Sequence, residues 1–219
     1  SSGGALTDET WGASLDSDSA TDSKLFFKNS RFNVIIDTSS SVYEPAPDLD
    51  YSTSTSAMNN VLIGNNAGKT VTTGSQNTLI GAGAGDSITT GYQNTLLGCN
   101  AGDTITTGYR NTFIGYEAGE GTPTDHRLAT YVGYRAGYLA VGGGQQNITA
   151  LGYEAGYRAR ENSTAIGHMA GSQRFYSSGG AYQGTSVGSV AGGSYYNYYR
   201  SYNVDVGYQS GVTNRQGDY

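Results

Sequence analysis

Features typical of enzymes and nucleic-acid binders are scarce in this sequence of 219 residues. It contains one cysteine, Cys99, so neither an intrachain disulfide nor a cysteine pair for zinc or redox chemistry can form. Its 12 lysines and arginines are scattered singly among 18 aspartates and glutamates, and the net charge is −6. Because no basic stripe is present to neutralise a phosphate backbone, nucleic acid is not expected as a partner.

Long apolar runs are missing as well. No segment approaches the roughly 18 to 20 apolar residues of a membrane helix, so direct insertion into a membrane is not expected. Charged residues make up only 14 per cent of the chain, whereas glycine accounts for 34 residues, about twice its average usage. A helical or α/β domain would need more helix-forming residues and longer apolar segments. The composition therefore predicts an all-β fold of short strands and many turns.

Catalytic and metal-binding motifs are weak. The order and spacing of Ser, His and Asp suggest no triad, and no carboxylate pair lies in an apolar setting, so the chain is not expected to be an enzyme or to carry a cofactor. Asp16, Asp18 and Asp22 have the first spacing of a calcium loop. Thr21 and Phe27 stand where such a loop requires Gly and Glu, so no metal is expected.

The two histidines are far apart in the sequence and have no neighbouring cysteine. His126 and His168 are therefore expected on the surface or in turns, although a trimer could bring three copies of His168 together on its axis. Asn147 and Asn162 begin glycosylation-type triplets. Chance matches are common in a chain rich in Asn, Ser and Thr, so these triplets carry little weight.

An internal repeat organises most of the chain. Four segments begin at Asn60, Asn77, Asn94 and Asn111, a step of 17 residues each time, and each reaches a glycine through apolar or β-branched residues before an Ala-Gly pair. Including looser copies, nine marker glycines occur: Gly64, Gly81, Gly98, Gly115, Gly133, Gly152, Gly167, Gly188 and Gly207. Later spacings range from 15 to 21 residues, which is typical of a solenoid that accepts insertions in its loops. Each unit predicts one coil, with a strand before the marker glycine and a second strand at Val71, Ile88 or Ile105.

Alternation along each strand predicts where its side chains point. The residue before each marker glycine is aliphatic and the residue two places earlier is β-branched, and both columns are expected inside the coil. The aliphatic column is Ile63, Ile80, Leu97, Ile114, Val132, Leu151, Ile166, Val187 and Val206. The β-branched column is Val61, Thr78, Thr95, Thr112, Thr130, Thr149, Thr164, Thr185 and Val204.

The column between these two is then expected to point outward. It begins with Leu62, Leu79, Leu96, Phe113 and Tyr131. An outward ladder of large apolar side chains needs a cover, and the simplest cover is the same ladder on a neighbouring identical chain. These five residues are therefore the predicted trimer interface.

The repeat resembles those of a known group of fibrous proteins. It is similar to the repeats of YadA-like heads in trimeric adhesins. It is closer to the Asn-Thr-Phe-Ile-Gly-Tyr-x-Ala-Gly repeats of phage tail fibres and bacterial surface fibres that carry endosialidase-type intramolecular chaperones, and Asn111 to Gly119 matches that pattern at every fixed position. The resemblance covers residues 60 to about 211. It implies a left-handed parallel β-roll or β-solenoid of about nine coils, an intertwined or tightly packed homotrimer, and an extracellular location on a bacterial cell surface or a phage virion.

The segments around the repeat complete the predicted organisation. Residues 1–56 are expected to form a leader, a β-hairpin cap and a proline-containing linker, because Leu25–Phe27 and Phe32–Ile36 have a hairpin pattern. Residues 57–212 are the repeat domain. Residues 213–219 are expected to lead to a further segment.

The tyrosines suggest a function. Nineteen occur, and many crowd the lengthened loops of the last coils. Tyrosine offers a flat apolar ring and a hydroxyl at low entropic cost, which suits recognition of glycans and proteins. The candidate ligand-binding residues are Arg174, Tyr176, Tyr182, Tyr195, Tyr196, Tyr198, Tyr199, Arg200 and Tyr202. An equally weighted alternative is that these rings pack between chains.

The expected function is attachment, as a trimeric fibre head or adhesin module that binds a cell-surface glycan or protein. A second hypothesis is a structural shaft or spacer with no ligand site of its own. A third, an ice- or surface-binding solenoid, requires a flat outward array of threonines, whereas the threonine column is expected to lie inside the coil.

Overall fold

The computed structural model describes residues 59–122, 124–140, 147–172, 182–192 and 200–211, and the backbone of two strands at 24–28 and 33–37. Side chains are described in the first three of these ranges and at 184–192 and 204–211. The described residues are all-β, with no helix among them. The strands are β1 (Lys24–Lys28), β2 (Asn33–Asp37), β3 (Val61–Ile63), β4 (Thr78–Ile80), β5 (Thr95–Leu97), β6 (Thr112–Ile114), β7 (Thr130–Val132), β8 (Thr149–Leu151), β9 (Thr164–Ile166), β10 (Tyr182–Val187) and β11 (Arg200–Val206).

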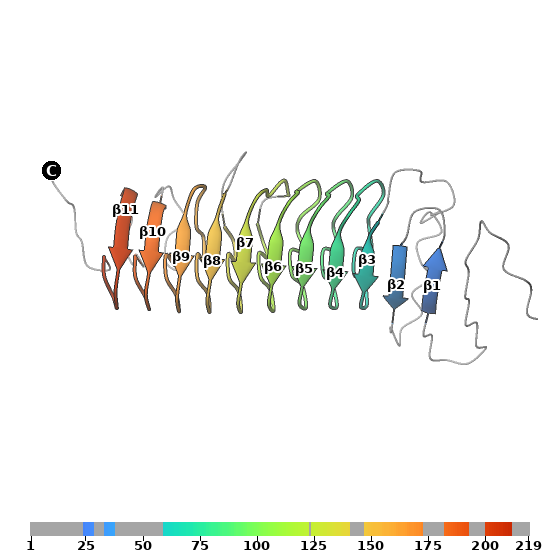
Figure 1. The fold of residues 1–219 in the computed structure, drawn as a ribbon, viewed down its shortest axis with the longest axis horizontal. Helices are drawn as coiled ribbons and strands as arrows, with labels where there is room; N and C mark the ends of the chain where they lie inside the picture. Colours follow the sequence, from blue (N-terminus) through green and yellow to red (C-terminus); the bar gives the residue numbers. More distant parts are fainter. Residues whose placement is uncertain are drawn as a thin grey trace, which may run out of the picture.

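All eleven strands form one sheet in sequence order, which runs along the long axis of the molecule (Figure 1). β1 and β2 pair antiparallel as the predicted hairpin, and β2 continues into the parallel sheet by pairing with β3. From β3 onward every neighbouring pair is parallel, and corresponding residues of successive repeats lie opposite each other, such as Leu62, Leu79 and Leu96. Each column of the repeat therefore stacks on its own copies.

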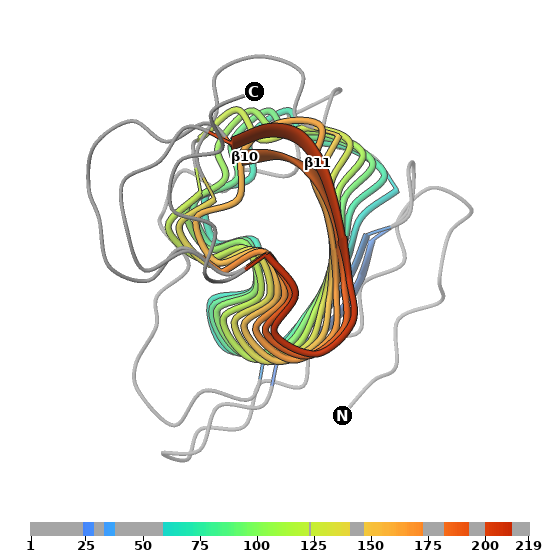
Figure 2. The same cartoon turned by 90° about the vertical axis from the view of Figure 1, so that its left-hand side faces the viewer.

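The chain is a parallel β-solenoid of about seven turns over β3–β9. Viewed along the axis, successive coils superpose and the strands occupy one flank (Figure 2). β10 and β11 extend the same parallel sheet. The connections that lead into these two strands lie outside the described residues, so the predicted total of nine coils stays a prediction.

The predicted direction of the strand side chains is wrong. The middle residue of each three-residue strand is buried and its two neighbours are more exposed, in every strand from β3 to β9. Leu79, Leu96, Phe113 and Tyr131 are 0% exposed within a single chain, and Leu62 is 3% exposed. These five residues form the core of the coil, and they are not an outward ladder that needs a partner. The aliphatic and threonine columns point outward instead.

The opposite wall of the coil explains this arrangement. It contributes its own apolar column of Val71, Ile88 and Ile105, all buried, and a column of buried alanines. The glycine of each Ala-Gly pair faces the middle column: a Cβ on Gly68 would lie 2.8 Å from a methyl carbon of Leu62. The interior of each coil therefore has room for one large side chain from the strand, and the middle residue of the strand fills this space.

The second predicted strand in each coil does not form. Val71 is buried, and the backbone N–H of Thr72 donates to the carbonyl oxygen of Thr89 in the next coil at 2.9 Å. This stretch is bent and carries no strand, although isolated bridges join Tyr92 to Tyr109 and Tyr109 to Arg127. Each coil from β3 to β9 therefore has one three-residue strand, and turns that hydrogen-bond to neighbouring coils make up the rest.

Buried asparagines hold the corner that precedes each strand. Asn60, Asn77, Asn94 and Asn111 are at most 1% exposed. The side-chain Nδ2 of Asn94 donates to Oδ1 of Asn77 at 3.0 Å, and its backbone N–H donates to the same oxygen at 3.0 Å. Asn111 repeats both bonds to Asn94. These asparagines mark the start of each repeat in the sequence, and their hydrogen-bonded ladder was not predicted.

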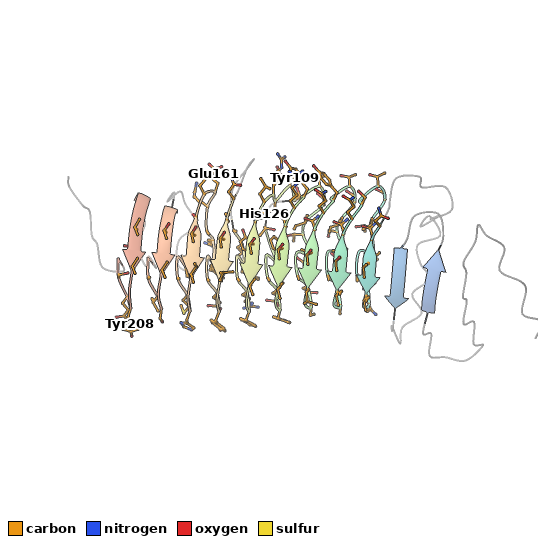
Figure 3. All side chains as sticks on the ribbon, in the orientation of Figure 1. Tyr109, His126, Glu161 and Tyr208 are labelled. Carbon is orange, nitrogen blue, oxygen red and sulfur yellow. The ribbon has the colours of Figure 1, made fainter. Side chains whose placement is uncertain are left out.

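His126 is a second correction, because it is buried and does not lie on the surface. Figure 3 labels His126 among the middle coils. The Nε2 of His126 hydrogen-bonds to the hydroxyl of Tyr131 in the core. Burial lowers the pKa of His126 to about 3, so the imidazole is neutral at physiological pH. His126 therefore gives the one buried tyrosine hydroxyl of the described core a partner.

Candidate binding surfaces

The predicted ligand-binding residues fall mostly outside the described part of the chain. Arg174, Tyr176, Tyr195, Tyr196, Tyr198 and Tyr199 are not described. Tyr182, Arg200 and Tyr202 are placed only as backbone of β10 and β11. Asp16, Asp18 and Asp22 also lie outside the described residues. Two other surfaces lie on described residues: the two strand columns that were expected inside the coil, and a row of aromatic rings that was not predicted.

The first surface is the outward side of β3–β11, here termed the sheet face. It consists of the aliphatic column and the threonine column, whose residues lie in register from strand to strand. No charged side chain occurs in either column. Leu97 and Ile166 are 42% and 38% exposed, and Val206 at the last strand is 66% exposed. The result is a straight, uncharged strip of methyl and hydroxyl groups with strands about 4.8 Å apart.

The second surface is a row of aromatic rings on the turn that follows the strands, here termed the tyrosine row. It comprises Tyr116, Tyr134, Tyr153 and His168, each directly after a marker glycine. Successive ring centroids lie 5.5, 5.0 and 5.2 Å apart, with interplanar angles of 9°, 10° and 14°. His168 is exposed, as expected, and it continues the stack of tyrosines. The tyrosine row could have been found in the sequence by extending the column analysis one residue past the marker glycine.

An ionic and hydrogen-bonded network fixes the start of the tyrosine row. The Nε of Arg135 pairs with a carboxylate oxygen of Glu117. The guanidinium of Arg135 also lies 5.3 Å from the ring centroid of Tyr134 and 5.0 Å from that of Tyr138. The hydroxyl of Tyr116 donates to Glu117, which raises the pKa of Tyr116 to about 12. Burial alone would raise the pKa of Glu117, but hydrogen bonds from Arg135 and Tyr116 together lower it.

Two carboxyl groups close to this network have raised pKa values. Burial, followed by the charge of Asp86, raises the pKa of Asp103 to about 6. Burial, followed by the charges of Asp103 and Glu117, raises the pKa of Glu120 to about 7. One oxygen of each group is buried without a hydrogen-bond partner. Stacking coils brings these carboxyl groups together because each turn places its acidic residue above the previous one.

We expect a pH-dependent contribution to stability from these two groups. A carboxyl whose pKa is raised by folding binds its proton more tightly in the folded chain, so this stability is present at low pH and is lost as the pH rises through about 6 to 7. The double variant Asp103→Asn, Glu120→Gln has no carboxyl group to ionise at these positions, so it should not lose this stability as the pH rises. Its melting temperature should exceed that of the unmodified chain by several degrees at about pH 8 and by much less at about pH 5.

His126 is present in both the unmodified chain and the double variant, so its contribution cancels in the difference between their melting temperatures. The lowered pKa of His126 acts in the opposite direction, because that stability is present above the ordinary histidine pKa and is lost as the pH falls below it. A variant whose advantage is the same at both pH values would contradict the role assigned to Asp103 and Glu120.

A separate pair of stacked rings lies on the edge of the coils opposite the tyrosine row. Tyr92 and Tyr109 stack at 4.9 Å with an interplanar angle of 7°, and Arg127 lies 5.4 Å from the ring centroid of Tyr109. Figure 3 shows Tyr109 and Glu161 at one edge of the molecule and Tyr208, which follows the last marker glycine, at the opposite edge. Tyr92 and Tyr109 can therefore serve as a control in mutational tests of the tyrosine row, because their rings stack in the same way on a different edge.

Metal-ligand clusters and membrane-spanning helices were both sought among the described residues. Within them no group of three or more histidine, cysteine, aspartate or glutamate side chains is arranged to hold a metal ion. Over the same ranges no helix has the length and apolar character needed to cross a membrane. Comparisons with protein-family models, with curated proteins and with solved structures give no match.

Proposed function

We propose that this chain is a rigid rod segment of an extracellular fibre that serves attachment to a cell-surface glycan or protein, and that identical chains cover its sheet face. The observation that carries the proposal is the uncharged strip formed by the two outward columns. A continuous strip of exposed methyl groups on a water-facing surface is typical of an interface. A second copy of the chain offers a strip of the same length, spacing and chemistry.

The resemblance of the repeat to those of YadA-like heads and chaperone-bearing tail fibres supports three chains, nine coils and left-handed winding. It also supports a location on a bacterial cell surface or a phage virion. The trimer interface that we now propose differs from the one expected from alternation. It consists of the aliphatic and threonine columns, and the Leu62 to Tyr131 column fills the interior of each chain.

The oligomeric state tests this proposal. The double variant Thr95→Lys, Leu97→Lys places two charges per chain on the sheet face, where identical chains would bring like charges together without partners. Light scattering should give three times the chain mass for the unmodified protein and a single chain mass for the variant. The folded coil should persist, because both side chains point away from its interior.

The matched control is Thr107→Lys. Thr107 is exposed in the same coil and does not belong to the sheet face, so this variant should remain a trimer. A stable monomer of the unmodified chain would rule out the trimer. Loss of assembly in the control would show that added charge alone is responsible.

A second candidate function is favoured by one specific observation. The threonine column faces outward on a straight sheet, and this is the arrangement that an ice- or surface-binding solenoid requires. The two functions compete for the same face, because an assembled trimer would cover it. If the unmodified chain is monomeric and slows ice recrystallisation, and Thr95→Lys abolishes this effect, the second function is supported and the first is rejected.

A further inference from the structure

The tyrosine row combines exposure with order. Tyr116, Tyr134 and Tyr153 are 45%, 38% and 45% exposed, so their outer edges face solvent. Each ring is nevertheless fixed by a neighbouring ring at 5.0 to 5.5 Å. The guanidinium of Arg135 adds contacts to the rings of Tyr134 and Tyr138. Side chains that are already ordered lose little conformational entropy when a ligand binds.

A parallel pair of rings widens this surface. Tyr138 and Tyr157 stack with centroids 5.4 Å apart and an interplanar angle of 18°. They lie on the same turn four residues after Tyr134 and Tyr153. Two short rows of stacked rings, joined by Arg135, therefore run along the solenoid axis. Tyrosine and arginine are among the residue types most enriched at energetically important positions of protein interfaces.

We propose that the tyrosine row is a binding track for an extended, neutral, β-linked polysaccharide that lies along the solenoid axis, with one sugar unit per coil. This inference rests on the proposed attachment function and deepens it by naming a site and a ligand class. It places the site on described residues of the middle coils and not on the loops from 174 to 182 and from 194 to 202.

The spacing of the rings favours a polysaccharide over a peptide. Each coil carries one ring of the row, with neighbouring centroids 5.0 to 5.5 Å apart, and successive coils advance about 4.8 Å along the axis, a step close to the length of one sugar unit in an extended β-1,4-linked chain. A peptide in β conformation advances about 3.3 Å per residue, so the side chains on one of its faces repeat at roughly 6.6 Å and soon fall out of step with the rings. A β-1,4-linked polysaccharide can place one sugar unit beside each ring of the row, with alternate units facing opposite ways.

The orientation of the rings sets the kind of contact. Because the ring faces stack on each other, the inner rings offer a ligand their edges and hydroxyl groups and not their flat faces. Each coil can therefore contribute hydrogen bonds to sugar hydroxyls and weak contacts with ring edges. A single sugar would bind poorly, whereas a polymer that spans several coils gains from many weak contacts at once.

The charges close to the tyrosine row favour a neutral ligand. Arg135, the cation nearest the start of the row, is already paired with Glu117. Asp103 and Glu120 add negative charge nearby once they ionise, and the whole chain carries a net charge of −6. An acidic polysaccharide would be repelled in these surroundings.

Sedimentation with insoluble cellulose and chitin, both β-1,4-linked and uncharged, tests the proposal. The full chain should sediment with at least one of them, and free glucose or N-acetylglucosamine should compete poorly. The double variant Tyr134→Ser, Tyr153→Ser interrupts the row and should lower the affinity at least tenfold. The control variant Tyr92→Ser, Tyr109→Ser on the opposite edge should bind like the unmodified chain.

A second variant separates binding from stability. Tyr134→Phe, Tyr153→Phe keeps both rings for stacking and removes the two hydroxyl groups, so it should melt like the unmodified chain and still lose most of the affinity. Failure of the unmodified chain to bind either polymer, or equal loss in the row and control variants, overturns the proposal. If the row variants keep full affinity for whole target cells, attachment stands and the tyrosine row is not its site.

Discussion

Replacing Phe113 by alanine should lower the free energy of unfolding by about 3 to 5 kcal/mol. Phe113 is fully buried, its ring stacks on that of Tyr131 with centroids 4.5 Å apart, and it meets the ring of His126 edge-on at 5.9 Å. The coil cannot collapse around the missing ring, because hydrogen bonds to the coils on either side fix its backbone. Urea unfolding monitored by circular dichroism measures the loss.

Ile114→Ala is the matched control for this change. Ile114 follows Phe113 in β6 and points to the opposite side of the strand, where it is only partly buried. Its replacement should cost well under half as much, provided that unfolding is measured at a concentration where chains are not associated. If Ile114→Ala lowered the free energy of unfolding more than Phe113→Ala, Ile114 would lie inside the coil, as the sequence alone suggested.

Gly98→Ala should prevent the central coils from forming or cost more than about 3 kcal/mol. The backbone of Gly98 has a φ of +141°, a conformation that costs a residue with a side chain about 1 to 3 kcal/mol. A Cβ at this position would in addition overlap the carbonyl oxygen of Gly115 in the next coil. The alanine methyl group and this carbonyl oxygen cannot occupy the same space. The two coils must therefore separate locally, or the chain must unfold.

Gly207→Ala separates the two causes. Gly207 has a φ of +119°, and a Cβ there would meet no atom within 4 Å. Its replacement should therefore cost only the backbone strain, and the difference between the two variants measures the steric overlap between coils. Similar melting temperatures for both variants would show that close stacking of the marker glycines contributes little to stability.

Much of the architecture could be predicted from the repeat. The step of 17 residues, the strand before each marker glycine and the register of each column on its copies follow from the sequence, because equal repeats can bury their apolar residues only by stacking in register. The hairpin at β1 and β2 also followed from its pattern of apolar residues. The column of Tyr116, Tyr134, Tyr153 and His168 is visible in the sequence one residue past the marker glycines, but its exposure is not. That exposure, the asparagine ladder and the burial of His126 were not predicted, because each depends on which side of a turn faces the interior.

The sequence by itself determined that the chain is an all-β solenoid, and it sorted the strand residues into two sets that point in opposite directions. Only the tertiary structure decided which set is inside. Alternation is symmetric with respect to the two faces of a strand, so it assigns Leu79 and Ile80 to different sides without saying which side is covered. The far wall of the coil breaks this symmetry: with Ile88, Ala84 and Gly85 already inside, the space that remains fits Leu79, and Thr78 and Ile80 must face outward.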